Sequence, residues 1–155
     1  MEPSNKKIIL DLIQRINDLL ETLEYPRKRL TQDYLEREYN HLCRYAKSKD
    51  RANYILLDIT DSDLSLTLRG FCSVLLAECA TFPRERNSQK EYAERIRQII
   101  EKEEIPAFRI ELSYSLSKIH GLKEEAITRF GSLKEQYAGN LETMALIEKY
   151  AKRIT

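Results

Sequence analysis

The sequence has few residues that make turns. Glycine and proline number four each among 155 residues, whereas a many-stranded sheet needs such residues at its many turns. Long hydrophobic runs are also missing, since no stretch approaches the roughly 18 apolar residues of a membrane span. The three cysteines, Cys43, Cys72 and Cys79, are odd in number and too sparse for a disulfide framework. We therefore expect a soluble, cytoplasmic protein with reduced thiols.

An excess of one charge is lacking as well. Lysine and arginine number 26 and aspartate and glutamate number 25, so the net charge is +1. This balance gives no overall field that would attract nucleic acid or an anionic membrane, and any such binding must come from a local patch. The chain is 42% hydrophobic and 33% charged, which is too apolar for a disordered protein. Its length suits one folded domain, 1–155.

Apolar residues recur at the three-and-four spacing of helices along most of the chain. The run YILLDI near residue 55 is compatible with helix or strand over 51–58, and we favour helix. The sequence predicts an all-α fold, either a compact multi-helix bundle or a short array of αα-hairpins. Seven or eight helices are expected, at about 5–24, 28–47, 51–57, 62–81, 89–103, 106–121, 122–137 and from 141 onward.

Capping residues predict where several of these helices begin. Asp50 is placed to cap the short helix, and the segment Thr60 to Asp63 precedes the apolar helix that follows. Ser88 and Glu91 have the spacing of a capping box, and Asn140 follows a glycine before the last helix.

The first predicted helix has more apolar residues than one buried face needs. A helix with two apolar faces requires two neighbours, either inside its own domain or on another chain. We therefore predict a protein partner or a homo-oligomer that contacts this helix. The candidate partner-binding residues are Ile9, Leu12, Ile16 and Leu20.

A local basic excess lies between the first and third predicted helices. Tyrosines are interleaved with the basic residues there, and cations beside stackable rings can bind single-stranded nucleic acid. The same residues also suit an ordinary surface, where tyrosine rings lie at the border of the core and the aliphatic parts of the lysine and arginine side chains pack over it. The candidate nucleic-acid-binding residues are Arg27, Lys28, Arg29, Arg37, Arg44, Lys47 and Arg51.

The segment IHGLKEEAITRF, residues 119–130, fits two kinds of helical hairpin. Ser117, Gly121 and Ile127 have the small, glycine and aliphatic spacing of the helix-turn-helix motif, which the chain resembles over 112–134. This resemblance implies a second helix that reads DNA. The first turn of that helix is acidic, however, and two carboxylates there would repel phosphates.

The same segment also resembles the hinge and second helix of a tetratricopeptide repeat. Gly121, Ala126 and Phe130 stand where that family has its turn glycine, its close-contact alanine and its aromatic residue. The first half departs from the pattern, because Tyr114 and Ser117 replace the expected small and aromatic residues. The 34-residue period is also absent. This resemblance implies a single αα-hairpin with Ala126 and Phe130 inward, and Ile127 is expected inward beside them.

Motifs that carry chemistry are few. The chain has two histidines, His41 and His120, which restricts acid-base and metal chemistry. Glu38 and His41 form one Glu-x-x-His pair of the di-iron type, but a second pair is missing because Ser117 precedes His120 by three residues. No Gly-rich phosphate loop, Cys-x-x-Cys pair or nucleophile elbow occurs. We expect no enzyme activity, no catalytic residues, no cofactor and no metal.

These observations favour a non-catalytic helical protein-interaction module or a small subunit of a larger assembly. No small-molecule ligand or membrane contact is indicated. The alternative is a nucleic-acid-binding protein that uses the basic segment 27–51 or the hairpin 112–134.

Overall fold

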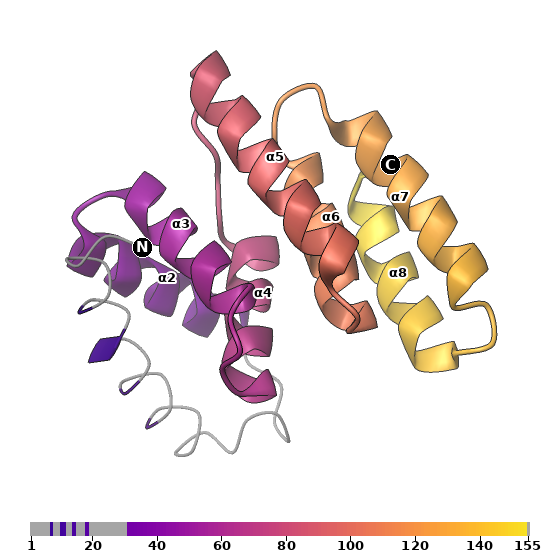
Figure 1. Ribbon diagram of the computed structural model, residues 1–155, viewed down its shortest axis with the longest axis horizontal. Helices are drawn as coiled ribbons and strands as arrows, with labels where there is room; N and C mark the ends of the chain where they lie inside the picture. Colours follow the sequence, from indigo (N-terminus) through magenta and orange to yellow (C-terminus); the bar gives the residue numbers. More distant parts are fainter. Residues whose placement is uncertain (1–6, 8–9, 12–13, 15–17, 19–30, 155) are drawn as a thin grey trace. The chain divides into compact units, whose positions relative to one another are not determined.

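The computed structural model describes residues 31–154 and five earlier positions, which are 7, 10, 11, 14 and 18. Over these residues the chain is helical and has no strand, which confirms the predicted all-α fold. Figure 1 traces the helices in order. They are α2 (Gln32–Ala46), α3 (Lys49–Thr60), α4 (Leu66–Glu78), α5 (Arg86–Lys102), α6 (Pro106–Ser117), α7 (Lys123–Gln136) and α8 (Leu141–Ile154).

The contacts divide the chain into two compact units, Met1–Ala80 and Thr81–Thr155. We call them unit 1 and unit 2. The single folding domain that the length predicts, 1–155, stays a prediction. In unit 1, helices α2, α3 and α4 all contact one another. In unit 2, α6 contacts α5, α7 and α8, and α7 also contacts α8.

Helix α3 shows why its sequence pattern was ambiguous between helix and strand. Ile55, Leu56 and Leu57 are consecutive, and all three are fully buried. Beyond its first two residues, only a narrow side of α3, with Arg51, Tyr54 and Asp58, is half-buried rather than buried. So wide a buried face leaves little polar stripe, and the helical period is therefore weak in this short run. Asn53, also fully buried in α3, accepts a 2.6 Å hydrogen bond from the hydroxyl of Tyr39 in α2. This bond joins α2 to α3 inside unit 1.

Helix α4 carries the one fully buried cysteine among the described residues. Cys72 lies in the core, and burial raises the pKa of its thiol. Cys43 and Cys79 are half-buried, and none of the three forms a disulfide.

Helix α6 is the central element of unit 2. It buries residues on all sides, including Phe108, Ile110 and Leu116. Two buried serines also lie on it, and each satisfies its hydroxyl by donating to a backbone carbonyl four residues earlier. Ser113 donates to Arg109 at 2.7 Å, and Ser115 donates to the carbonyl of residue 111 at 3.2 Å.

Three helices begin at caps other than the predicted ones. Ser48 rather than Asp50 caps α3, where its hydroxyl accepts from the amide of Arg51 at 3.0 Å. Ser65 caps α4, after the predicted Thr60–Asp63 segment. Glu85 caps α5, and its carboxylate accepts from two amides of the first turn, so Ser88 lies inside the helix rather than at its cap. Serine and acidic residues within a few positions compete for the same free amides, so the pattern alone does not select the cap.

The remaining cap is as predicted. The side chain of Asn140 accepts from the amide of Thr143 at 3.0 Å at the start of α8. The turn between α6 and α7 is also as predicted at Gly121, whose φ of 84° lies in the left-handed region that favours glycine.

The α6–α7 hairpin has the inward positions of the tetratricopeptide resemblance. Ala126 is fully buried and Phe130 is 3% exposed, whereas Ile127 is 36% exposed. The inward placement predicted for Ile127 is therefore wrong. The two buried positions are four residues apart on the face of α7 that is packed inside unit 2, and Ile127 is rotated by one residue, about 100°, from Ala126. Ile127 is therefore not in the buried position that a helix-turn-helix motif requires.

Gly131 lies in the middle of α7 and is exposed. A Cβ at this position would meet nothing within 4 Å, and its backbone does not have positive φ. We therefore expect Gly131→Ala to stabilise the protein by about 0.5–1 kcal/mol, because alanine loses less conformational entropy in a helix. Urea denaturation followed by circular dichroism measures the change. Gly121→Ala is the matched control and should destabilise, because its φ disfavours a side chain. An unchanged or lower stability for Gly131→Ala would contradict this account of α7.

Candidate binding pocket

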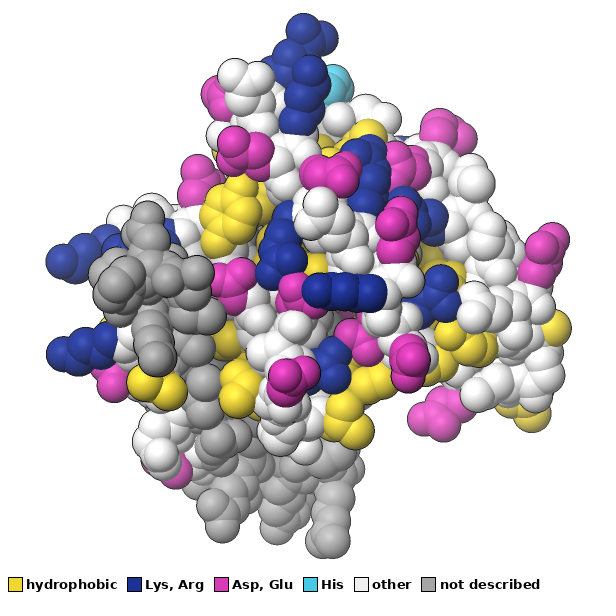
Figure 2. All heavy atoms as spheres, viewed as in Figure 1, with side chains coloured by type: hydrophobic (Ala, Val, Ile, Leu, Met, Phe, Trp, Pro, Cys, Tyr) yellow, Lys and Arg dark blue, Asp and Glu magenta, His cyan; other side chains and the backbone are white. Residues whose placement is uncertain are grey.

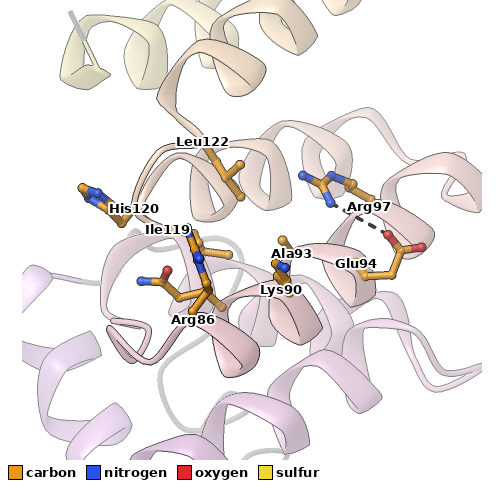
Figure 3. Close-up of a pocket in the computed structure, with 9 residues that line it drawn as sticks. Arg86, Lys90, Ala93, Glu94, Arg97, Ile119, His120 and Leu122 are labelled. Atoms are coloured by element: carbon orange, nitrogen blue, oxygen red, sulfur yellow. Dashed lines mark ion pairs between the residues drawn. The ribbon is translucent and has the colours of Figure 1, made fainter.

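Unit 2 contains a pocket between α5 and the turn that joins α6 to α7 (Figure 3). Its volume is about 480 Å³, which is within the roughly 300–1,000 Å³ range of ligand-binding sites. Helix α5 contributes one side, and Ile119, His120 and Leu122 contribute the other. Because α5 and α6 pack together, the two sides are held by regular secondary structure rather than by a long loop.

Three apolar side chains line the inner part of the pocket. Ala93 and Ile119 are buried, and Leu122 is half-buried. Leu122 extends from the turn toward α5 (Figure 3). This inner part, which we call the apolar floor, can accept a small apolar group from a ligand.

Basic side chains form most of the remaining lining. Arg86 and Lys90 are exposed, and neither forms an ion pair or hydrogen bond with another side chain in the part of the chain that the structure describes. His120 and Arg97 lie at opposite ends of the pocket (Figure 3). Gln89 adds an amide, and Glu94 is the one acidic residue of the lining. The pocket therefore has a cationic rim around an apolar floor.

Arg97 is held in place by carboxylates on two helices. Its Nε and Nη2 donate to the two oxygens of Glu125 in α7 at 2.8 and 2.7 Å, a bidentate arrangement. Its Nη1 lies 3.8 Å from Glu94 in α5. Arg129 also contacts Glu125, at 3.3 Å. These residues tie α5 to α7 and fix one end of the pocket.

The same contacts determine the ionisation of the network. The hydrogen bonds from Arg97 hold the pKa of the Glu125 carboxyl below its usual range, although partial burial acts in the opposite direction. The bonds to Glu125 likewise raise the pKa of Arg97. Both groups are therefore charged at neutral pH, and the charge of Arg97 is largely balanced within the network. Arg86 and Lys90 are the cations of the rim that remain available to a ligand.

One side of this pocket has a local signal in the sequence, which the search for apolar spacing does not detect. Arg86, Lys90, Ala93 and Arg97 are spaced by four, three and four residues, which places them along one face of a helix. The face can be predicted from α5 alone. Its partner, the α6–α7 turn, cannot, because it approaches α5 only through the packing of α5 on α6.

The partner-binding residues predicted from the sequence lie outside the described residues. These are Ile9, Leu12, Ile16 and Leu20, and three of the predicted basic residues, Arg27, Lys28 and Arg29, lie outside as well. The structure does not place these seven residues, so their predicted roles stay predictions.

The other candidate nucleic-acid residues lie at the surface of unit 1. Arg37, Arg44 and Lys47 are exposed, and Arg51 is half-buried. Over 31–54 the chain has five basic and four acidic residues, so the described part has almost no basic excess. Figure 2 shows basic and acidic side chains interspersed over the face in view, rather than separated into patches.

The tyrosines of this segment do not form an exposed stacking surface. Tyr39 is buried, with its hydroxyl bonded to Asn53. Tyr45 is 46% exposed, and its hydroxyl donates to Asp11 at 2.7 Å. Tyr34 and Tyr54 are half-buried. Their placement is that of residues at the edge of a core.

The first turn of α7 has the wrong charge for a DNA-reading helix. Glu124 is exposed there, and Glu125 holds both Arg97 and Arg129. Arg129, which lies on this helix, therefore contacts a carboxylate within unit 2. This arrangement gives the helix-turn-helix interpretation no structural support.

The described residues contain no group of three or more histidine, cysteine, aspartate or glutamate side chains that could hold a metal ion. No helix among them is long and apolar enough to cross a membrane.

No protein-family model, curated protein or solved structure shows significant similarity to this chain. Its class is therefore defined by the fold and the pocket. The described residues form an all-α protein with two compact helical units, and the second unit has a pocket with an apolar floor and a cationic rim.

Proposed function

We propose that this protein is a non-catalytic helical interaction module, or a small subunit of a larger assembly, and that it binds a protein partner through the pocket of unit 2. The pocket is the observation that carries this proposal. It combines buried apolar side chains with exposed basic side chains, as the centre and rim of protein-binding sites do. Helix α5 on one side and the short α6–α7 turn on the other give it a preformed shape, which reduces the entropic cost of binding.

The chemistry of the lining supports binding over catalysis. Guanidinium, ammonium and amide groups hold a ligand through charge and hydrogen bonds, and they do not exchange protons readily at neutral pH. Histidine is the side chain that most often serves in acid-base catalysis, and His120 is the one histidine of the lining. It is exposed, and no hydrogen bond from another described residue orients its ring. A catalytic histidine is normally oriented by such a bond.

Nucleic-acid binding through α2 is the second candidate. The exposed Arg37, Arg44 and Lys47 favour it, although acidic residues are mixed with them. Such binding would weaken by orders of magnitude between about 50 and 200 mM salt, because phosphate contacts release counterions.

Site-specific photo-cross-linking tests the proposed function. The photo-reactive amino acid p-benzoylphenylalanine replaces Leu122, and the protein is irradiated in cells of its natural source. A second variant with p-benzoylphenylalanine in place of Glu135 is the control. Glu135 is exposed on α7 and does not line the pocket. We expect a discrete protein adduct from position 122 and little from position 135. Adducts that are sensitive to nuclease, or equal yields from both positions, would contradict the proposal.

A further inference from the structure

The pocket of unit 2 also indicates what kind of partner segment it fits. We propose that it binds a short acidic peptide segment of the partner, with one apolar side chain on the floor and carboxylates beside it at the rim. This inference rests on the proposed function, because it takes the occupant to be part of a protein.

Charge complementarity is the first argument. Arg86 and Lys90 are one helical turn apart, about 6 Å along the axis of α5, and both are exposed at the rim. Arg97 lies 3.8 Å from Glu94 and donates to Glu125, so the acidic group of the lining already has a cation beside it. The uncompensated charge of the rim is therefore positive, and it favours carboxylates over basic groups.

The apolar floor is the second argument. Ala93, Ile119 and Leu122 offer a surface that an inorganic anion would not use. A volume of about 480 Å³ is also much larger than one small ion needs. A peptide segment uses both features, since an apolar side chain covers the floor while its acidic neighbours meet Arg86 and Lys90.

The composition of the lining argues against a nucleic-acid occupant. Single-stranded nucleic acids bind through bases stacked on aromatic rings beside a basic groove. Among the nine lining residues, no phenylalanine, tyrosine or tryptophan is present, and the ring of His120 lies at one end. The floor is aliphatic, which suits a leucine-like side chain better than a base.

Nuclear magnetic resonance titration tests the inference with three synthetic pentapeptides. The first has four glutamates around a central leucine, the second has four lysines around leucine, and the third has four glutamates around serine. We expect only the first to shift the amide signals of Ala93, Ile119 and Leu122 strongly, with the effect reduced at about 200 mM salt. No shift with the first peptide at 5 mM or equal shifts with the lysine peptide would overturn the inference. Shifts confined to residues outside the pocket would overturn it too.

Two charge variants locate the binding. The double variant Arg86→Gln and Lys90→Gln should weaken binding of the first peptide by about five- to tenfold. The double variant Arg84→Gln and Lys134→Gln makes the same charge change at exposed positions outside the lining and should leave binding nearly unchanged. An equal loss in both variants would show that overall charge, rather than the pocket, attracts the peptide.

A substitution on the floor separates this inference from the proposed function. Leu122→Asp and Leu122→Asn remove the same apolar contact, and only the first adds a negative charge. We expect Leu122→Asp to bind the acidic peptide at least fivefold more weakly than Leu122→Asn. Equal binding by the two variants would overturn the acidic occupant. If the two variants bound equally but position 122 still cross-linked a protein, the proposed function would stand and only the acidic segment would be excluded.

Discussion

Replacing Phe130 with alanine is expected to lower the free energy of unfolding by about 3–5 kcal/mol, which is the usual cost of removing a buried phenylalanine. The ring is 3% exposed in α7, and α7 packs on α6 and α8. Its removal leaves a cavity inside unit 2 that a helical hairpin cannot close fully. Urea denaturation followed by circular dichroism gives the magnitude, and amide hydrogen exchange in α6 and α7 locates the loss.

Ile127 is the matched control for Phe130. It lies on the same helix and is 36% exposed, so Ile127→Ala should cost less than about 1 kcal/mol. The two variants distinguish the two hairpin interpretations, because a helix-turn-helix packing would bury Ile127. A larger loss of stability from Ile127→Ala than from Phe130→Ala would contradict the observed burial, in which Phe130 faces inward and Ile127 does not.

Replacing Glu125 with glutamine is expected to lower stability at pH 7 by about 1–2 kcal/mol. The substitution removes the charged bidentate partner of Arg97 and the contact to Arg129. The magnitude is modest because the side chains remain about a third exposed and water screens them. Glu124→Gln is the matched control, since it is exposed in the same first turn of α7 and forms no ion pair with another described residue. Its effect should stay below about 0.5 kcal/mol.

The effect of Glu125→Gln should depend on pH in a defined direction. Arg97 holds the pKa of Glu125 in the folded protein below the unfolded value of about 4.3, so the unfolded chain binds this proton more readily. The stabilisation is therefore fully present above that pH and is lost as the pH falls through the lower, folded pKa. The difference between wild type and variant should shrink below about pH 4. A difference that stays constant from pH 7 to pH 3 would show that the loss comes from packing rather than from charge.

The sequence predicted the fold class and most of the helices, because three-and-four spacing and helix ends are local properties. It predicted the inward positions of Ala126 and Phe130 and the turn at Gly121. It was wrong at Ile127, because Ala126 and Ile127 are both apolar and adjacent. Only the packing of α7 against α6 and α8 decides which of the two faces inward.

The pocket was harder to predict than the helices. One side can be predicted from the sequence, because a helix at α5 places Arg86, Lys90 and Arg97 along one face. The other side depends on where the α6–α7 turn lies, and no local pattern gives that position. The bidentate pair between Arg97 and Glu125 joins residues 28 positions apart, so it too becomes visible only in the folded unit.

The cross-link yield from position 122, compared with the yield from position 135, shows whether the pocket of unit 2 binds a protein. We expect a protein adduct of defined mass from position 122, resistant to nuclease and several times more abundant than that from position 135. Cross-links to nucleic acid alone, or equal and diffuse labelling from both positions, would contradict the claim that this pocket binds a protein partner.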